Sequence, residues 1–427
     1  MSINRVEKLC VLQRLPAGGR SGSGASRPAT LGRAVGIAMA ATLMLGAGGT
    51  LAPVSAGGIE RYSLRDAPAS RSESRTTATS RGWVNPLAAP DESMIGTALR
   101  GPAEQSGART SDGTVTGTDA RAFGSFGIPY TSTRVQLGRG RNLHDTKQLV
   151  ASYPYRTAGK LFFTVPGWGR THCSASVIER GIIVTAAHCV AGFGAGSGNF
   201  YEDFFFVPSF QRIGSGPIRP YSFWRADDII VPTVWMEGTD PGCGAARSND
   251  IAVLALQFRR DRAIGDVVGS MDYGWNDYSF VSSSRTGDLL TAAVTSLGYP
   301  GILDRGNAMQ RVDGPTYPVD LCNDTVVNYW QGSNVGGGAS GGPLVVNFGP
   351  RSARLSGGAQ PGTDPVMAVV GVTSWGAADP NAPKDNYATR FGQNSVFSGD
   401  DYGGYGAGNI GALINHVCTQ VGSEYCR

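Results

Sequence analysis

The stretch Gly336-Gly337-Gly338-Ala339-Ser340-Gly341-Gly342-Pro343 places one serine among five glycines, and the apolar residues 344–346 follow it. Glycine adopts backbone angles that other residues avoid, and it lets another backbone approach closely. A serine on such a loop can expose its hydroxyl group beside free backbone N–H groups, as a nucleophile and an oxyanion site require. The same composition is also typical of a flexible loop before a strand, so the rest of the chain must decide between the two interpretations.

The composition of the chain favours a turn-rich β protein. Of its 427 residues, 16% are charged and 62 are glycine, whereas charged residues usually make up about 25% and glycine about 7%. Short apolar runs alternate with Gly, Pro and Asp turns, as at 161–165, 182–185, 251–256 and 366–374. Strands this short and numerous predict an all-β barrel or sandwich. A polar break near 257–288 divides them into two β units.

The two ends of the chain have distinct patterns. Residues 1–56 combine a basic region that ends at Arg33, an apolar stretch at 34–47 and the small residues 54–56, which is typical of a cleaved signal peptide. A membrane anchor is the alternative, but the glycines and Pro53 make a poor spanning helix. At the other end, apolar residues at 410, 413, 414 and 417 predict a short helix over about 408–420. We therefore expect a secreted protein without stable membrane insertion after signal cleavage.

Residues 57–133 are rich in Ser, Thr, Gly, Ala and Arg and have no apolar period. We interpret them as a disordered linker or propeptide. Outside residues 1–56, which hold six basic residues and one acidic residue, the chain has 31 basic and 32 acidic residues. This balance does not favour nucleic-acid binding.

Six of the seven cysteines lie outside the predicted signal peptide. An even number in an exported protein indicates a disulfide framework. Because no C-x-x-C pair is present, the spacing does not predict a zinc site. We expect no metal and no organic cofactor.

A histidine and an aspartate each follow or precede an apolar run. His188 lies in Thr185-Ala186-Ala187-His188-Cys189, after the run 182–184, and histidine titrates where a general base must. A disulfide between Cys189 and Cys173, 16 residues apart, would fix its ring. Asp250 directly precedes the apolar run 251–256, where a buried carboxylate needs a strong partner such as a histidine N–H. The plainer interpretations are a packing histidine and an Asx-turn.

In chain order, Thr-Ala-Ala-His-Cys, Asn-Asp-Ile-Ala-Val-Leu, Gly-x-Ser-Gly-Gly-Pro and Ser374-Trp375-Gly376 resemble the chymotrypsin/trypsin-like serine protease family. The resemblance covers about residues 134–427. Tyr153–Lys160, Phe206–Phe210 and Gly298–Gly301 are similar to its secreted bacterial glutamyl-endopeptidase-like branch. The resemblance implies two chymotrypsin-like β-barrels, the first at about 150–260 and the second at about 285–407.

The resemblance also implies a role for each motif residue. Ser340 would be the nucleophile of a serine endopeptidase, His188 its general base and Asp250 the residue that orients the base. The N–H groups of Gly338 and Ser340 would form the oxyanion hole. Ser374, Trp375 and Gly376 would bind the backbone of a polypeptide substrate as an added strand. For the disulfides it supports Cys173–Cys189; Cys418–Cys426 are paired by proximity, and Cys243–Cys322 then follow by elimination.

Two departures from the family pattern bear on activation and specificity. Digestive members have an aspartate before the nucleophile that pairs with the new N-terminus, and here Ala339 cannot do so. Neither Asn334, six positions before Ser340, nor Thr373 gives the substrate pocket a charge. We therefore expect a neutral pocket formed by Asn334, Val335 and Thr373 that accepts small or apolar residues.

We expect this protein to act as a monomer. The alternative function is a protease-like binding protein without catalysis. A simple esterase is disfavoured because the serine is not in Gly-x-Ser-x-Gly followed by a helix.

Overall fold

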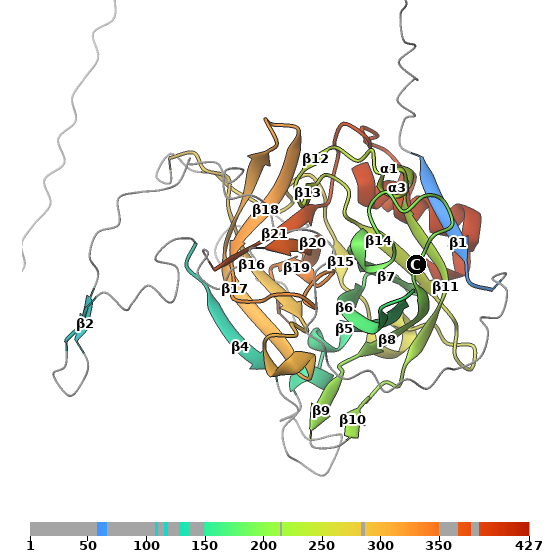
Figure 1. The fold of residues 1–427 in the computed structure, drawn as a ribbon, viewed down its shortest axis with the longest axis horizontal. Helices are drawn as coiled ribbons and strands as arrows, with labels where there is room; N and C mark the ends of the chain where they lie inside the picture. The colour runs from blue at the N-terminus through green and yellow to red at the C-terminus, as the bar shows by residue number, and fades with distance from the viewer. Residues whose placement is uncertain are drawn as a thin grey trace, which may run out of the picture. The chain divides into compact units, whose positions relative to one another are not determined.

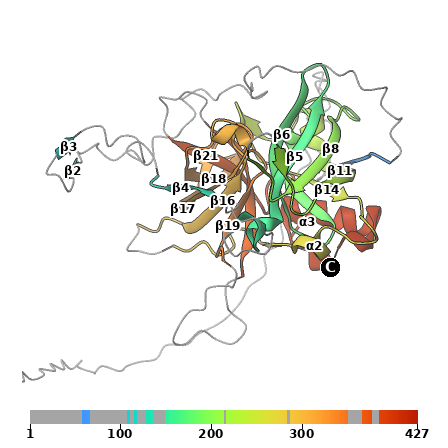
Figure 2. The same cartoon turned by 90° about the horizontal axis from the view of Figure 1, so that it is seen from below.

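The computed structural model describes residues 58–65, 107–109, 115–117, 128–135, 149–213, 216–282, 287–349, 366–376 and 384–426. All of them belong to one compact unit, Val54–Arg427. The predicted signal peptide lies outside the described residues. Strands dominate the unit, and Figures 1 and 2 show them gathered in two barrels that lie side by side.

The first barrel closes on itself with six strands. In chain order they are β5 (Ala158–Val165), β6 (Gly169–Val177), β7 (Ile182–Thr185), β8 (Glu202–Pro208), β11 (Trp224–Pro232) and β14 (Ala252–Leu256). Their order around the barrel is β5-β6-β7-β14-β11-β8, and β8 pairs with β5 again. One further strand, β1 (Ile59–Ser63), pairs with β11 on the outside.

The second barrel has the same topology. Its strands are β16 (Ala292–Gly298), β17 (Met309–Leu321), β18 (Val326–Gly332), β19 (Pro343–Val346), β20 (Ala368–Gly376) and β21 (Asp385–Arg390). The order β16-β17-β18-β21-β20-β19 closes through the pairing of β19 with β16. If the six strands of each barrel are numbered along the chain, their order around both barrels is 1-2-3-6-5-4. This arrangement confirms the predicted pair of chymotrypsin-like barrels.

Shorter elements complete the described secondary structure. The remaining strands are β2 (Gly107–Arg109), β3 (Val115–Gly117), β4 (Thr131–Val135), β9 (Gln211–Ile213), β10 (Gly216–Ile218), β12 (Gly242–Cys243), β13 (Ala246–Arg247) and β15 (Asp272–Tyr273). The α-helices are α1 (Thr233–Glu237), α2 (Gly265–Val268) and α3 (Gly408–His416). Within the described residues, no helix is both long and apolar enough to cross a bilayer.

The continuously apolar strands of the first barrel have two buried faces. On β14, Leu254 belongs to the cluster inside the barrel, together with Ile183 of β7. The intervening Val253 faces outward and belongs to a second cluster, which includes Val345 and Val369 of the other barrel and the apolar side of α3. Strands that alternate between two apolar environments have no polar face. This second core holds the barrels together, and the active-site candidates lie along their junction.

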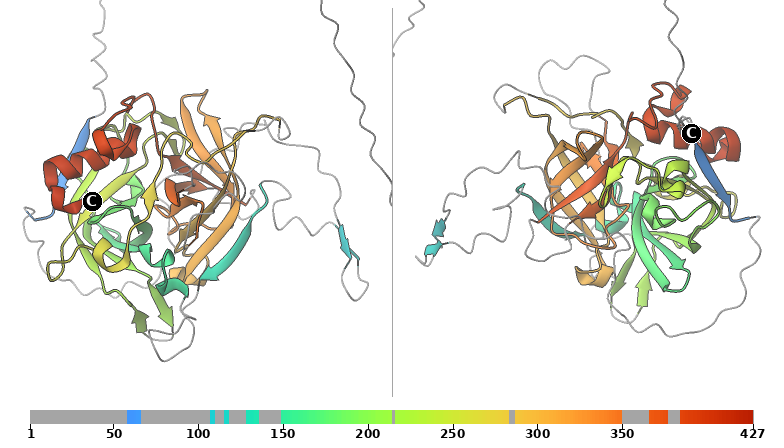
Figure 3. Two further views of the ribbon diagram at one scale, coloured as in Figure 1. Left: turned by 180° about the vertical axis from the view of Figure 1, so that it is seen from behind. Right: turned by 45° about the horizontal axis from the view of Figure 1, so that its top comes forward.

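The predicted C-terminal helix is present as α3, and one π-helical turn, Val417–Val421, extends it. Figure 3 shows the helix beside β1 on the outside of the first barrel. Within the range interpreted as a disordered linker, the structure differs at three places, because β1 pairs with β11, β2 pairs with β3, and β4, which begins in this range, pairs with β17. The strands β1 and β4 each find an open sheet edge, a tertiary partner that local sequence patterns do not reveal.

Candidate active site

The pairing of β7 with β14 brings His188 and Asp250 together. Ala252 lies opposite Thr185. Asp250, two positions before Ala252, and His188, three positions after Thr185, therefore meet at one end of the two strands. His188 occupies a 3₁₀ turn, Ala187–Cys189, that directly follows β7. Its Nδ1 lies 2.7 Å from Asp250 Oδ2, and its backbone N–H donates to Asp250 Oδ1 at 2.9 Å.

Asp250 is fully buried and accepts a third hydrogen bond, at 2.5 Å, from the hydroxyl group of Ser374 on β20. Burial acts to raise the pKa of this carboxyl group. The charge of His188 and the hydrogen bonds from His188 and Ser374 outweigh burial and hold the pKa of Asp250 below its usual value. The carboxylate therefore stays ionised and fixes the tautomer in which Nδ1 of His188 carries the proton. The opposite nitrogen, Nε2, is buried and has no hydrogen-bond partner among the described residues.

The glycine-rich loop that carries Ser340 is docked between the barrels. The N–H of Gly341 donates to the Thr373 carbonyl at 2.7 Å, and the N–H of Thr373 donates back to Gly342 at 2.9 Å. A Cβ on Gly341 would lie 2.0 Å from the Thr185 Oγ1 atom and 2.9 Å from the Ala186 nitrogen. The nucleophile candidate is thereby held against the end of β7, next to the turn that bears His188.

The loop leaves two particular N–H groups unused. From residue 338 to 342, the N–H groups of Ala339, Gly341 and Gly342 donate to backbone carbonyls. Those of Gly338 and Ser340 have no acceptor among the described residues. Gly338 has a φ of +93°, and the preceding Gly337 carbonyl is held by the N–H of Gly301 at 2.7 Å. Two neighbouring donors are thus free, as in an oxyanion site.

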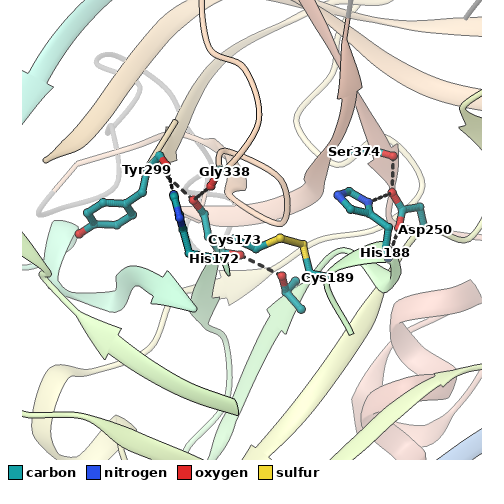
Figure 4. Close-up of a disulfide and its surroundings, with 10 residues drawn as sticks. His172, Cys173, His188, Cys189, Asp250, Tyr299, Gly338 and Ser374 are labelled. Atoms are coloured by element: carbon teal, nitrogen blue, oxygen red, sulfur yellow. Dashed lines mark hydrogen bonds and ion pairs between the residues drawn. A yellow bond between two sulfur atoms is a disulfide. The ribbon is translucent and has the colours of Figure 1, made fainter. Parts of the chain in front are cut away.

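Ser174 on β6 holds this loop from the first barrel, a role that the sequence analysis did not find. Its N–H donates to the Ser340 carbonyl and its hydroxyl donates to the Gly338 carbonyl, both at 2.8 Å. The same hydroxyl accepts from the Tyr299 N–H at 2.8 Å. Figure 4 shows Tyr299 and Gly338, the partners of this hydroxyl group, on one side of the Cys173–Cys189 disulfide and His188 on the other side. The only sign of this role in the sequence is that Ser174 directly follows Cys173, a predicted disulfide cysteine.

The predicted substrate-binding residues belong to two segments. Asn334 and Val335 directly precede the glycine-rich loop, and Thr373 to Gly376 lie on β20. The structure adds Asn386, which lies opposite Gly376 in the pairing of β20 with β21. With its amide oriented so that both polar atoms are paired, Asn386 donates to the carbonyls of Asp385 at 2.9 Å and Val335 at 3.1 Å. Asn334 Oδ1 is buried without a partner among the described residues. An uncharged, amide-lined wall therefore joins Asn334 and Val335 to Gly376.

Trp375 of β20 lies on the opposite side of its strand from this wall. Its ring stacks on that of Tyr387 with the centroids 3.8 Å apart, and its indole N–H donates to Asn328 Oδ1 at 3.1 Å. The Trp375 side chain is thus held by a ring on one face and by a hydrogen bond at its indole nitrogen.

Three disulfides have the pairings expected from the sequence, Cys173–Cys189, Cys243–Cys322 and Cys418–Cys426. Among the described residues, one group of potential metal ligands lies close together, His188 with Cys173 and Cys189. Both sulfur atoms are already bonded to each other, so this group does not offer thiolates to a metal.

Three solved structures are similar in fold. A thermostable serine protease AL20 from an extremophilic microorganism is 20% identical, with a TM-score of 0.41, over 56% of this chain and 92% of its own. Protease Anisep from Arthrobacter nicotinovorans is 22% identical, with a TM-score of 0.41, over 56% and 91%. A Glu endopeptidase in complex with MPD is 16% identical, with a TM-score of 0.40, over 67% and 94%. Likenesses of this size carry no information about the substrate.

No curated protein matches the chain in sequence. The sequence model of the family described as Trypsin does match, over residues 152–395, which is more than half of the chain and includes His188, Asp250, Ser340 and Ser374. The chain therefore belongs to the trypsin family of serine proteases.

Proposed function

We propose that this protein is a serine endopeptidase in which Ser340 forms an acyl-enzyme with the substrate. The observation that carries the proposal is the His188–Asp250 pair. Its two side chains lie 2.7 Å apart, the carboxylate is fully buried, and Nε2 on the opposite edge of the imidazole is unpaired. An imidazole held in this way has one nitrogen ready to take a proton. Family membership supplies the substrate class, a polypeptide.

The proposed reaction uses each group once. His188 Nε2 takes the proton of the Ser340 hydroxyl as that oxygen attacks the peptide carbonyl, and it then gives the proton to the leaving amine. Asp250 stabilises the imidazolium that forms in between. The free N–H groups of Gly338 and Ser340 stabilise the oxyanion, and the loss of one such donor typically costs about 2.7–4 kcal/mol. Ser340 makes no hydrogen bond with Nε2 here, and such bonds often tighten only with substrate.

We also propose that the substrate pocket selects small or apolar side chains. The uncharged wall of Asn334, Val335, Thr373 and Asn386 supports this preference, because none of these groups could pair with a charged side chain. Profiling the cleavage sites in a denatured protein mixture tests it. Strong selectivity for Arg and Lys, or for Glu, would contradict a neutral pocket.

Further proposals concern maturation and the mature protein. Residues 1–56 act as a signal peptide, the protein is secreted, and it works as a monomer. Ala339 is buried and carries no carboxylate, so a new N-terminal amine has no partner at this position. Cleavage within 57–133 is therefore not the chemical trigger of activity. N-terminal sequencing of the secreted protein, combined with activity measurements on each form, tests this, since dependence on a single N-terminus would contradict it.

Covalent labelling tests the activity directly. A fluorophosphonate probe should label the wild-type protein and should not label Ser340→Ala. Casein digestion, compared with the hydrolysis of a simple ester, then separates a protease from an esterase. Wild-type protein that is not labelled, or that is labelled no more than the variant, would favour the protease-like binding protein instead.

A further inference from the structure

A cavity of about 330 Å³ is lined mainly by residues of the first barrel and includes none of the Ser340 loop. Three of its lining residues are arginines, Arg170, Arg212 and Arg219, and three are aromatic, Phe162, Phe205 and Phe210. Lys160 also lines the cavity; burial and the charge of Arg212 lower the pKa of its amino group to about 7, so this group is only partly charged at neutral pH. Pro217 and Asn307 complete the described lining. The walls come from β5, β6, β8 and the β9–β10 hairpin, which Figure 1 draws below these strands. None of the described lining residues is acidic.

The positive charges of this cavity have no carboxylate partner among the described residues. Arg170 lies 5.3 Å over the ring of Phe205, and Lys160 Nζ lies 4.9 Å from the ring centre of Phe210. Aromatic faces hold cations in place without neutralising them. Asp304, the acid of the adjacent turn, is already engaged by Arg134 and by Gln310. The cavity therefore presents a cluster of arginine charges that no carboxylate of its described lining neutralises.

Strand register ties the cavity to the Ser340 loop. Phe205, Phe162 and His172 lie directly opposite one another across β8, β5 and β6, so their side chains share one face of the barrel wall. A Cβ on Gly338 would lie 2.6 Å from His172 Nε2. A Cβ on Gly306 would lie 2.7 Å from the same nitrogen and 3.0 Å from Lys160 Nζ. The imidazole of His172 thus packs against Gly338 of the oxyanion candidate and lies close to Lys160, which lines the cavity.

The position of the cavity indicates which part of a substrate would reach it. In the proposed mechanism, the acyl part of the substrate lies along Ser374–Gly376. Figure 4 shows Ser374 and His172 on opposite sides of the Cys173–Cys189 disulfide. A chain that starts at Ser374 and passes over Ser340 continues toward His172 with the residues that follow the cleaved bond. The cavity consequently faces the leaving-group side.

We propose that this cavity is a second specificity site, which binds an acidic side chain located two to four residues after the cleaved bond. The inference rests on the proposed protease function. The carboxylate would accept hydrogen bonds from the exposed guanidinium groups of Arg170, Arg212 and Arg219. The three phenylalanine rings exclude water from one side and strengthen the attraction. The enzyme would then select its substrate at two places. The neutral pocket would bind the side chain before the cleaved bond, and the arginines of the cavity would bind an acidic side chain after it.

Pairs of internally quenched peptides test the proposal. Each peptide carries the sequence that the enzyme cleaves best in casein, ends in a C-terminal amide, and has either Glu or Gln at the second, third or fourth residue after the bond. We expect a kcat/KM about five- to tenfold higher for Glu at one of these positions, mostly through KM, and less at high salt. In the double variant Arg170→Gln/Arg212→Gln the ratio should fall toward one. Arg260→Gln, which removes one positive charge outside the cavity, is the control and should leave the ratio unchanged.

A p-nitroanilide of the same acyl sequence separates the two proposals, because it has no residues after the bond. Hydrolysis of the anilide with equal rates for Glu and Gln at all three positions would overturn the second specificity site alone. A Glu preference that survives in the double variant would overturn the assignment to this cavity. Hydrolysis of neither substrate would overturn the protease function itself.

Discussion

A Cβ on Gly341 would lie 2.0 Å from the hydroxyl oxygen of Thr185, so the loop that bears Ser340 rests directly on the strand that leads to His188. The two residues belong to different barrels and are far apart in the chain. Their contact leaves no space for a side chain. Glycine at 341 is therefore needed for its small size as well as for its φ of +75°.

Gly341→Ala should destabilise the protein by about 3 kcal/mol. A positive φ costs a residue with a Cβ about 1–2 kcal/mol, and overpacking adds about 1–3 kcal/mol. Displacement of Ser340 should lower kcat/KM by about 100-fold. Urea unfolding and peptide hydrolysis measure the two effects. Gly167→Ala is the matched control, since Gly167 has a φ of +77° with no atom near its Cβ position. Equal behaviour of the two variants would show that the contact with Thr185 is unimportant.

Ser174→Ala should reduce activity more than overall stability explains. The variant loses the hydroxyl group that binds the Gly338 carbonyl and the Tyr299 N–H, and an unpaired buried N–H costs about 1–3 kcal/mol. With Gly338 less fixed, we expect kcat to fall about tenfold with little change in KM. Ser176→Ala, on the same strand, removes a buried hydroxyl that has no described partner and should change neither value. A loss confined to KM would contradict the role of Ser174 in positioning the oxyanion donors.

The sequence predicted those parts of the fold and site that local patterns encode. Asp250 and His188 each adjoin an apolar strand, and the pairing of those strands brings them together. The Ser340 loop was recognisable because its backbone conformation requires glycines next to the serine, such as Gly338 and Gly341, which have positive φ angles. Such features can be recognised in one short window. The residues alone predicted an all-β barrel or sandwich, and the resemblance of these motifs to a known family implied the two barrels.

Residues whose role depends on distant strands escaped the sequence analysis. Ser174 contacts Gly338 across 164 positions, and Asn386 lies beside Gly376 only because of the register between β20 and β21. The strand β1 is a further example, because Arg61 meets Asp228 across 167 positions. Local composition gives no sign of such partners, which arise only when the barrels close.

The buried Asp385 should make stability depend on pH in the acid range. Burial raises the pKa of this carboxyl group to about 6, although the Trp330 indole N–H donates to it at 2.7 Å. The folded state thus favours the protonated form. The contribution of protonated Asp385 to the free energy of unfolding is fully present below about pH 4 and is lost as the pH rises through about 6.

Asp385→Asn should remove this dependence, because an amide keeps an acceptor for Trp330 and carries no charge. We expect the variant to be more stable than wild type by up to about 3 kcal/mol at pH 8 and to differ little at pH 4. Unfolding in urea across this pH range, followed by tryptophan fluorescence, measures the difference. Asp320→Asn, an exposed change in the same sheet, is the control. A constant difference between wild type and Asp385→Asn at all pH values would contradict the prediction.

The strand β1 should remain part of the folded protein even if the chain is cut between residues 66 and 127. Arg61 Nε lies 2.8 Å from Asp228 Oδ1, whose side chain is 1% exposed, and Arg65 pairs with Asp227 and with the hydroxyl group of Tyr425. Glu60 also accepts from the Ser197 hydroxyl and the Gly198 N–H at 2.9 and 2.8 Å. Removal of one partner from a buried ion pair costs about 3–5 kcal/mol.

A chain that lacks residues 57–65 should therefore unfold about 3 kcal/mol more easily, since Asp228 loses its partner. Addition of a synthetic peptide of residues 57–65 should restore stability in proportion to its concentration, because ligands that bind only the folded state stabilise it by mass action. The same peptide with Arg61→Gln and Arg65→Gln should restore far less. Thermal unfolding at several peptide concentrations measures both. A truncated chain as stable as the intact one would show that β1 is dispensable, and equal rescue by the two peptides would assign its effect to strand pairing alone.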